Sequence, residues 1–242
     1  ALAALAEAFQ TNALRSFLMG EQLDAIVRAL ASRGIPVALL KGAAMGRTVY
    51  DSPAARLVND LDLLIPSDRV DEARAALLGL GYRAAGPAGR GRLGRWQRRY
   101  RAELQMVGAA PGREGLLVEF HWSLVELPYL IDRIPMAEVW ASARPCPGLP
   151  GALLPDAATL LLHACAHVAL HHSRSLRLIW LVDIDRLARW AELDWAAVAD
   201  RATRWGLSLA VQEALGATAA WLGTPVPPAA AAQLAEAAAD PV

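Results

Sequence analysis

Two aspartates, Asp60 and Asp62, are separated by one residue in an apolar run and are candidate ligands for a divalent cation. Alternate side chains of a strand point to the same side and lie about 6–7 Å apart, so both carboxylates can reach one ion. Mg²⁺ prefers oxygen ligands and commonly takes water and substrate phosphates as the others. The pair therefore predicts metal-assisted chemistry on a phosphate. The alternative is a structural role in which Arg56 neutralises the two acids.

A single lysine, Lys41, precedes these acids in a chain whose other basic residues, out of 24, are arginine. An ammonium group is not equivalent to a guanidinium group at a phosphate or in a tight turn. The following Gly42 allows a close approach of the backbone. We therefore expect Lys41 to take part in chemistry at a phosphate. The alternative is that one lysine has survived by chance.

A third carboxylate would complete a two-metal site. Glu119 is the candidate because it lies in the middle of a predicted strand over residues 116–122, on the same face as His121. The third acid of such a site acts as a metal ligand or as a base. His121 is expected either to contact the substrate or to be a hydrogen-bonded histidine at the rim of the site.

The front half of the chain mixes helices and strands. Two helices are expected over residues 2–32, with a break near Gly20, because glycine disfavours a helix interior. Beyond them the patterns predict a strand at 37–40, a helix from 42 to about 50, a strand at 59–65, a helix ending near Gly81, and a hairpin of 95–107 with 116–122.

The back half is helical in pattern, with segments at 156–172, 177–191, 194–205, 207–222 and 228–239. Pro145–Pro155 contains four prolines and two glycines, which is typical of a linker. The predicted fold class is therefore α+β, with a mixed sheet flanked by helices and then an all-helical half. We expect a first domain over residues 1–150 and a second over 151–242.

The overall charge argues against nucleic acid or a membrane as a partner. The formal net charge is zero and the pI is near 7.2. Two cysteines without ligand spacing suit a reducing cytoplasm. The segment from Arg83 to Arg101 contains seven arginines. They either bind a triphosphate, an acidic acceptor or a nucleic-acid base, or form a solvated hairpin. The sequence does not define an oligomeric state.

Three histidines, His163, His167 and His171, lie four residues apart on one predicted helix face. Such spacing can bind zinc, but a polar helix face is the simpler interpretation. His167 and Asp183 are candidates either for contact with the acceptor substrate or for a hydrogen-bonded pair between helices.

The block from Lys41 to the two aspartates resembles the uncharacterised nucleotidyltransferase family of the DNA polymerase beta-like superfamily. The similarity covers roughly residues 35–190. It is carried by Leu40–Ala44, Tyr50, Arg56, Asn59–Leu64, Gly81-Tyr82, Glu119–Trp122 and Arg177–Asp183.

The resemblance implies a small mixed sheet that binds Mg²⁺, with Mn²⁺ as the alternative, and a nucleoside triphosphate at the edge carrying Asp60 and Asp62. These two residues and Glu119 would take the metal positions. Better-known superfamily members have Gly-Ser or Gly-Gly where this chain has Lys41-Gly42-Ala43. Lys41 is expected to supply a charge in place of the missing hydroxyl, and Gly42 and Arg56 are expected to bind the phosphates with it.

The implied reaction is transfer of a nucleoside monophosphate from the triphosphate to a hydroxyl, phosphate or carboxylate of a small molecule or peptide. Family members resemble tailoring enzymes of natural-product biosynthesis. Two alternatives remain open: kinase-like phosphoryl transfer at the same site, and a non-catalytic, antitoxin-like module that binds a partner protein.

Overall fold

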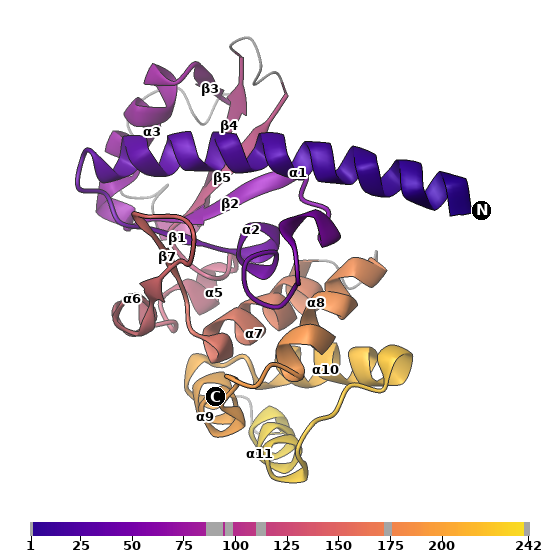
Figure 1. The fold of residues 1–242 in the computed structure, drawn as a ribbon. Helices are drawn as coiled ribbons and strands as arrows, with labels where there is room; N and C mark the ends of the chain where they lie inside the picture. The colour runs from indigo at the N-terminus through magenta and orange to yellow at the C-terminus, as the bar shows by residue number, and fades with distance from the viewer. Residues whose placement is uncertain (1, 86–93, 95–98, 110–114, 172–175, 240–242) are drawn as a thin grey trace. The chain divides into compact units, whose positions relative to one another are not determined.

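The computed structural model of this chain describes residues 2–85, 94, 99–109, 115–171 and 176–239. The chain forms two compact units (Figure 1). The first spans residues 1–126 and 143–154, and the second spans residues 127–142 and 155–242. Every strand of the described residues lies in the first unit, whereas the second unit is built of helices. The predicted α+β class is confirmed.

The described strands of the first unit form one seven-stranded mixed sheet in the order β3-β4-β5-β2-β1-β7-β6. The pairs β2–β5 and β1–β7 are parallel and the other pairs are antiparallel. The acids of β2 therefore lie on the middle strand, and the expectation that they occupy a sheet edge is wrong. The strands are β1 (Val37–Leu39), β2 (Asp60–Leu64), β3 (Tyr82–Ala84), β4 (Glu103–Gly108), β5 (Leu117–His121), β6 (Arg144–Pro145) and β7 (Ala152–Leu154).

The register of the three neighbouring strands β4, β5 and β2 separates a polar face from an apolar face. Glu119 lies opposite Asp62 on one side and opposite Gln105 on the other. One residue further along, Phe120 lies opposite Leu63, and both are fully buried. Paired residues on neighbouring strands point to the same face, and successive residues of one strand point to opposite faces. The apolar side chains are therefore buried on one face of the sheet, and the polar side chains lie on the other.

Helix α1 (Leu2–Ala31) packs with α3 (Val70–Gly79) and runs across the sheet (Figure 1). It is one continuous helix, so the expected break near Gly20 is wrong. A Cβ atom at Gly20 would meet no atom within 4 Å, so no close contact requires a glycine at this position. A glycine costs only about 1 kcal/mol in a helix interior. Burial of the following residues Leu23, Ile26 and Leu30 outweighs that cost.

Two further expectations for the first unit are corrected. The helix after β1, α2 (Lys41–Met45), ends well before residue 50, and turns follow it. The segment expected to be a linker, Pro145–Pro155, contributes β6 and β7 to the sheet. Proline removes a backbone donor and is tolerated where a strand has only one neighbour. Pro145 lies in β6, which is the outermost strand next to β7.

The helices predicted for the back half are present, and a π-helical turn follows the first of them. Asp156 caps α7, since its side chain accepts a hydrogen bond from the Thr159 amide at 2.8 Å. None of the helices in the described residues is long and apolar enough to cross a membrane. The elements of this unit are α5 (Pro128–Ile131), α6 (Met136–Ser142), α7 (Ala157–Ala166), the π-helical turn (His167–His171), α8 (Leu178–Ala188), α9 (Trp195–Trp205), α10 (Ser208–Leu222) and α11 (Pro228–Ala239).

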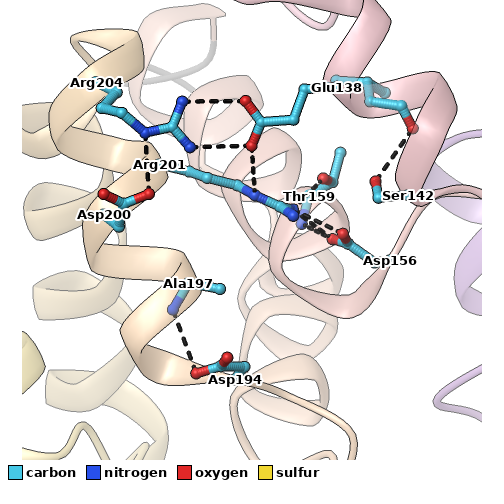
Figure 2. Close-up of polar contacts among 10 residues, drawn as sticks. Glu138, Ser142, Asp156, Thr159, Asp194, Ala197, Asp200, Arg201 and Arg204 are labelled. Carbon is cyan, nitrogen blue, oxygen red and sulfur yellow. Dashed lines mark hydrogen bonds and ion pairs between the residues drawn. The ribbon is translucent and has the colours of Figure 1, made fainter.

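One arginine of α9 joins three segments of the helical unit (Figure 2). The Arg201 guanidinium contacts Glu138 of α6 at 3.1 Å and the N-cap residue Asp156 at 2.7 Å. The arginine side chain is only 14% exposed, so little water competes for these contacts. Burial raises the pKa of Asp156, but hydrogen bonds from Arg201 outweigh it and hold that pKa below its usual range. Arg204, one turn later, also contacts Glu138 but is 46% exposed.

These two arginines offer a matched pair for a stability test. We expect Arg201→Met to lower the free energy of unfolding by about 2 kcal/mol, since it leaves partly buried carboxylates without their charged donor. Arg204→Met should cost at most about 1 kcal/mol, as is usual for an exposed ion pair. Urea unfolding of both variants measures the difference. Equal losses would contradict the assignment of Arg201 as the joining residue.

Candidate active site

Asp62 is the centre of the polar cluster on the sheet. Its side chain is almost fully buried on β2. One carboxylate oxygen, Oδ1, lies 2.7 Å from Lys41 Nζ and 3.0 Å from His121 Nε2. The two partners come from different elements, the start of α2 and the end of β5. Lys41 and His121 thus neutralise Asp62 in the role that the sequence analysis had considered for Arg56.

Glu119 lies beside Asp62 because β5 pairs with β2 in parallel register. Its Oε2 atom is 3.7 Å from both Lys41 Nζ and His121 Nε2. Ligand atoms of Asp62, Glu119 and His121 all lie within 4.8 Å of one another. The sheet register therefore brings together two of the three predicted metal-binding acids.

Lys41 has an unusual backbone conformation that directs its side chain to these acids. Its φ of 42° is the only positive value for a non-glycine residue in the described ranges. The left-handed region costs an ordinary residue roughly 1–2 kcal/mol. Glycine would adopt this conformation without strain but would supply no ammonium group. The strain is therefore consistent with selection for the charge of Lys41.

The charges of the cluster stabilise one another against burial. Burial alone would raise the pKa of Asp62, but the Lys41 ammonium and the hydrogen bond to His121 hold it well below its usual range. Burial lowers the pKa of Lys41, yet Asp62 more than compensates and raises it. At neutral pH the cluster therefore contains ionised Asp62 and an ammonium group at Lys41.

His121 is buried and bonded to Asp62, so it is not a histidine at the rim of the site. Burial disfavours its charged form, but the interactions with Asp62 and Glu119 raise its pKa to about 9. The folded pKa exceeds the ordinary value of 6.5. The resulting stabilisation is therefore complete below about pH 6.5 and is lost as the pH rises through about 9.

This pKa can be measured on the protein without added metal. We expect NMR titration of the His121 ring to give a midpoint near pH 9. In Asp62→Asn the midpoint should fall, because the anionic partner has been removed. A midpoint at or below 6.5 in the unsubstituted protein would show that the ring is neutral in the cluster.

Asp60 lies two residues before Asp62 on the same face of β2 and is partly exposed. Burial, with repulsion from Asp62 and Glu119, raises its pKa to about 6. Asp60 is outside the tight group formed by Asp62, Glu119 and His121. It therefore occupies the more open side of the cluster, where repulsion between carboxylates favours an additional cation.

Gly42 and Arg56 lie together next to the cluster. A Cβ atom at Gly42 would lie 3.2 Å from Val58 Cγ2 and 3.6 Å from Arg56 Nη1, so a larger residue would crowd this corner. Arg56 is buried and donates a hydrogen bond to the Leu57 carbonyl oxygen. The predicted phosphate-binding residues Lys41, Gly42 and Arg56 are therefore neighbours in space.

The other predicted site residues lie in the second unit. His167 is in the π-helical turn, where its ring makes an edge contact with Trp180 at 5.2 Å between centroids, and Asp183 is buried in α8. His163 is buried in α7. Most of the arginine-rich segment 83–101 lies outside the described residues, and its binding role stays a prediction.

The sequence analysis missed three polar residues next to His121 and Glu119. Glu103, His121 and Glu126 have ligand atoms within 4.8 Å of one another. Burial, with repulsion from Glu126 and Glu119, raises the pKa of Glu103 to about 7. Gln105, two residues along β4, donates to both Glu119 and Glu103. The pairing of β4 with β5 could have identified Glu103 and Gln105, since both share the face of Glu119.

The donor set of the cluster fits a divalent cation that prefers oxygen. Asp62 and Glu119 offer adjacent carboxylate oxygens, and Asp60 adds a third carboxylate on the open side. Without a bound ion, the raised pKa of His121, about 9, favours a protonated ring that donates a hydrogen bond to Asp62.

Comparison with known proteins identifies a family and two structures of similar fold. The chain matches a family described as "Uncharacterised nucleotidyltransferase" over residues 1–223. The fold is similar to that of the antibiotic-resistance factor ANT(2″)-Ia, with a TM-score of 0.54, 14% identity, and coverage of 85% of this chain and 98% of that one. It is also similar to an antigenic nucleotidyltransferase-like protein from Paracoccidioides brasiliensis, with a TM-score of 0.50, 16% identity, and coverage of 88% and 89%. Comparison with curated protein sequences gave no match.

Proposed function

We propose that this chain, which belongs to the uncharacterised nucleotidyltransferase family, transfers a nucleoside monophosphate from a nucleoside triphosphate to a small-molecule or peptide acceptor. The acceptor contributes a hydroxyl, phosphate or carboxylate oxygen. That oxygen forms a bond to the α-phosphorus while the bond from the α-phosphorus to pyrophosphate breaks, and the acceptor proton passes to solvent or to a nearby base. We assign Mg²⁺ as the ion that accompanies the triphosphate, with Mn²⁺ as a substitute.

The observation that carries this proposal is the pairing of Asp62 with Glu119 across parallel strands, with Asp60 on the same face. These three acids would hold the divalent ion, which supplies charge neutralisation for the phosphates and the leaving pyrophosphate. Buried acids are costly unless paired, and Lys41 and His121 reduce that cost when no ion is bound.

Lys41 has two roles in this proposal. Its ammonium lies 2.7 Å from Asp62 Oδ1, so it occupies space beside an oxygen that the divalent ion needs. Two cations on one carboxylate oxygen repel each other. Lys41 therefore gives up part of its contact with Asp62 in the loaded enzyme and turns to the polyphosphate. Gly42 and Arg56 lie next to it and extend the phosphate-binding surface.

The acceptor is proposed to be a natural product or its precursor, since the family resemblance points to tailoring enzymes. The proposed location of the protein is the cytoplasm. Residues of the second unit, including His167 and Asp183, are proposed to contact the acceptor. Nucleic acid is a poor candidate because the formal net charge is zero.

Two labelled substrates test the transfer reaction. The protein is incubated with Mg²⁺, a set of trial acceptors, and ATP or GTP labelled at either the α- or the γ-phosphorus. The proposal predicts label in the acceptor from the α-position only, release of pyrophosphate, and a product heavier by one nucleotidyl group. Label from the γ-position would instead identify a kinase.

Calorimetric titration with Mg²⁺ and a non-hydrolysable triphosphate separates the enzyme from a partner-binding module. The proposal predicts saturable binding that is lost in Asp62→Asn. If the folded protein does not bind any nucleotide and is recovered from cells in a stable complex with another protein, the enzymatic proposal is wrong.

A further inference from the structure

Strand β4 adds two polar side chains to the face of the sheet that carries the candidate site. In the antiparallel pairing of β4 with β5, Gln105 lies opposite Glu119 and Glu103 lies opposite His121. Both β4 side chains are partly buried, while the alternating residues Leu104 and Met106 are buried on the other face. Gln105 is therefore held next to Glu119 by the sheet itself.

The Gln105 amide forms a bridge between two carboxylates. Its Nε2 atom donates to Glu119 Oε1 at 2.9 Å and to Glu103 Oε1 at 3.2 Å. A primary amide nitrogen has two N–H groups, and here each has an acceptor. The amide nitrogen faces both carboxyl groups, and an ionised carboxylate can accept a hydrogen bond from this nitrogen but not from the amide oxygen. Glu103 thereby fixes the orientation of Gln105.

This bridge distinguishes the two oxygens of Glu119. Oε1 is bonded to Gln105, whereas Oε2 lies 3.7 Å from Lys41 Nζ and His121 Nε2, the two cations that also contact Asp62. A free glutamate side chain has several rotamers and can turn its carboxylate. The hydrogen bond on Oε1 selects the arrangement in which Oε2 faces Lys41 and His121, the two partners of Asp62.

We propose that Gln105 is a positioning residue that keeps Glu119 Oε2 directed towards Asp62, so that the two acids form a preorganised divalent-cation site. This inference rests on the proposed function, since it assigns Glu119 to the metal site. Partners of a metal-binding side chain typically change metal affinity by about 10–100-fold when they are removed.

The test replaces Gln105 with methionine, which has a similar length but no N–H groups. Gln212→Met is the matched control, because Gln212 is exposed on α10 in the second unit. Mn²⁺ is titrated into each protein without nucleotide, and free Mn²⁺ is measured by electron paramagnetic resonance. We expect the Mn²⁺ Kd of Gln105→Met to rise about tenfold, and that of Gln212→Met to stay within twofold of the unsubstituted protein.

A second readout distinguishes positioning from loss of structure. Transfer assays should show a higher Mg²⁺ concentration at half-maximal rate for Gln105→Met, with turnover largely recovered at saturating Mg²⁺. Circular dichroism and thermal unfolding report whether the variant is folded. If Gln105→Met does not fold, Gln105→Leu removes the same donors with a smaller side chain.

The outcomes separate this inference from the proposed function. If the unsubstituted protein binds Mn²⁺, Asp62→Asn does not, and folded Gln105→Met binds it with unchanged affinity, the positioning role is wrong and the metal site stands. If the unsubstituted protein does not bind Mn²⁺ even with a triphosphate present, the proposed function itself fails.

Discussion

Replacing Asp62 with asparagine should reduce turnover by about 10³-fold, because the candidate site loses the acid at its centre. Metal ions contribute several kcal/mol of charge stabilisation in phosphoryl-group chemistry, and about 4 kcal/mol corresponds to this factor in rate. Asparagine keeps the size of the side chain, so the loss would report on charge and not on packing. Steady-state transfer assays at saturating Mg²⁺ measure the effect.

The same substitution should also destabilise the protein without added metal. Asp62 is the ionic partner of both Lys41 and His121; the contact with His121 is buried, and the Lys41 side chain is 21% exposed. Removing one partner of a buried ion pair costs about 3 kcal/mol. Urea unfolding measures this cost, and exposed Asp51→Asn is the matched control. Unchanged stability together with unchanged turnover would refute the role of Asp62.

Replacing Lys41 with methionine should change metal and nucleotide binding in opposite directions. Without nucleotide, Mn²⁺ affinity should increase about tenfold, because the ammonium that lies 2.7 Å from Asp62 no longer repels the ion. The Kd for the metal–triphosphate complex should instead increase roughly thirtyfold, as expected for the loss of a charged hydrogen bond worth about 2 kcal/mol. Calorimetry provides both constants.

Arg28→Met is the matched control for loss of an exposed positive charge in the same unit. Lys41 is also the only lysine in the chain, so selective ¹⁵N labelling of lysine gives one side-chain signal. That signal should shift when Mg²⁺ and a non-hydrolysable triphosphate bind. Weaker Mn²⁺ binding by Lys41→Met would contradict the competition between Lys41 and the ion.

The acids of the candidate site could be proposed from sequence because their placement on one face depends on local periodicity. Alternation along a strand places Asp60 and Asp62 on one face, and the same rule pairs Glu119 with His121 on the next strand. The resemblance to the family added the expectation that Asp60, Asp62 and Glu119 take the metal positions. What remained hidden was the exact register, which depends on pairing between distant segments.

Gln105 illustrates information that was present but not used. The predicted hairpin turn spans residues 109–115, and a turn centred on residue 112 places 105 opposite 119 and 103 opposite 121, as the structure has them. The turn residues 110–114 themselves lie outside the described residues. The partnership of Lys41 with Asp62 could not be predicted in this way, because it depends on a left-handed backbone conformation at Lys41.

Expectations based on composition failed where tertiary contacts outweigh local preference. Gly20 was expected to break a helix, yet buried residues after it hold α1 together. The proline-rich segment at 145–155 was expected to be a linker, but an outer strand tolerates Pro145 and the segment completes the sheet. Gly20 costs only about 1 kcal/mol in the helix interior. Pro145 avoids the cost of a lost hydrogen bond because it lies in an outer strand.

The most direct test of the central claim is a diffraction experiment at the manganese absorption edge on crystals grown with Mn²⁺ and a non-hydrolysable nucleoside triphosphate. We predict an anomalous peak in contact with Asp62 and the triphosphate, with Glu119 or Asp60 as a further ligand and with Lys41 turned towards the phosphates. A bound nucleotide elsewhere, with no peak at these acids and with Lys41 still paired to Asp62, would contradict the account.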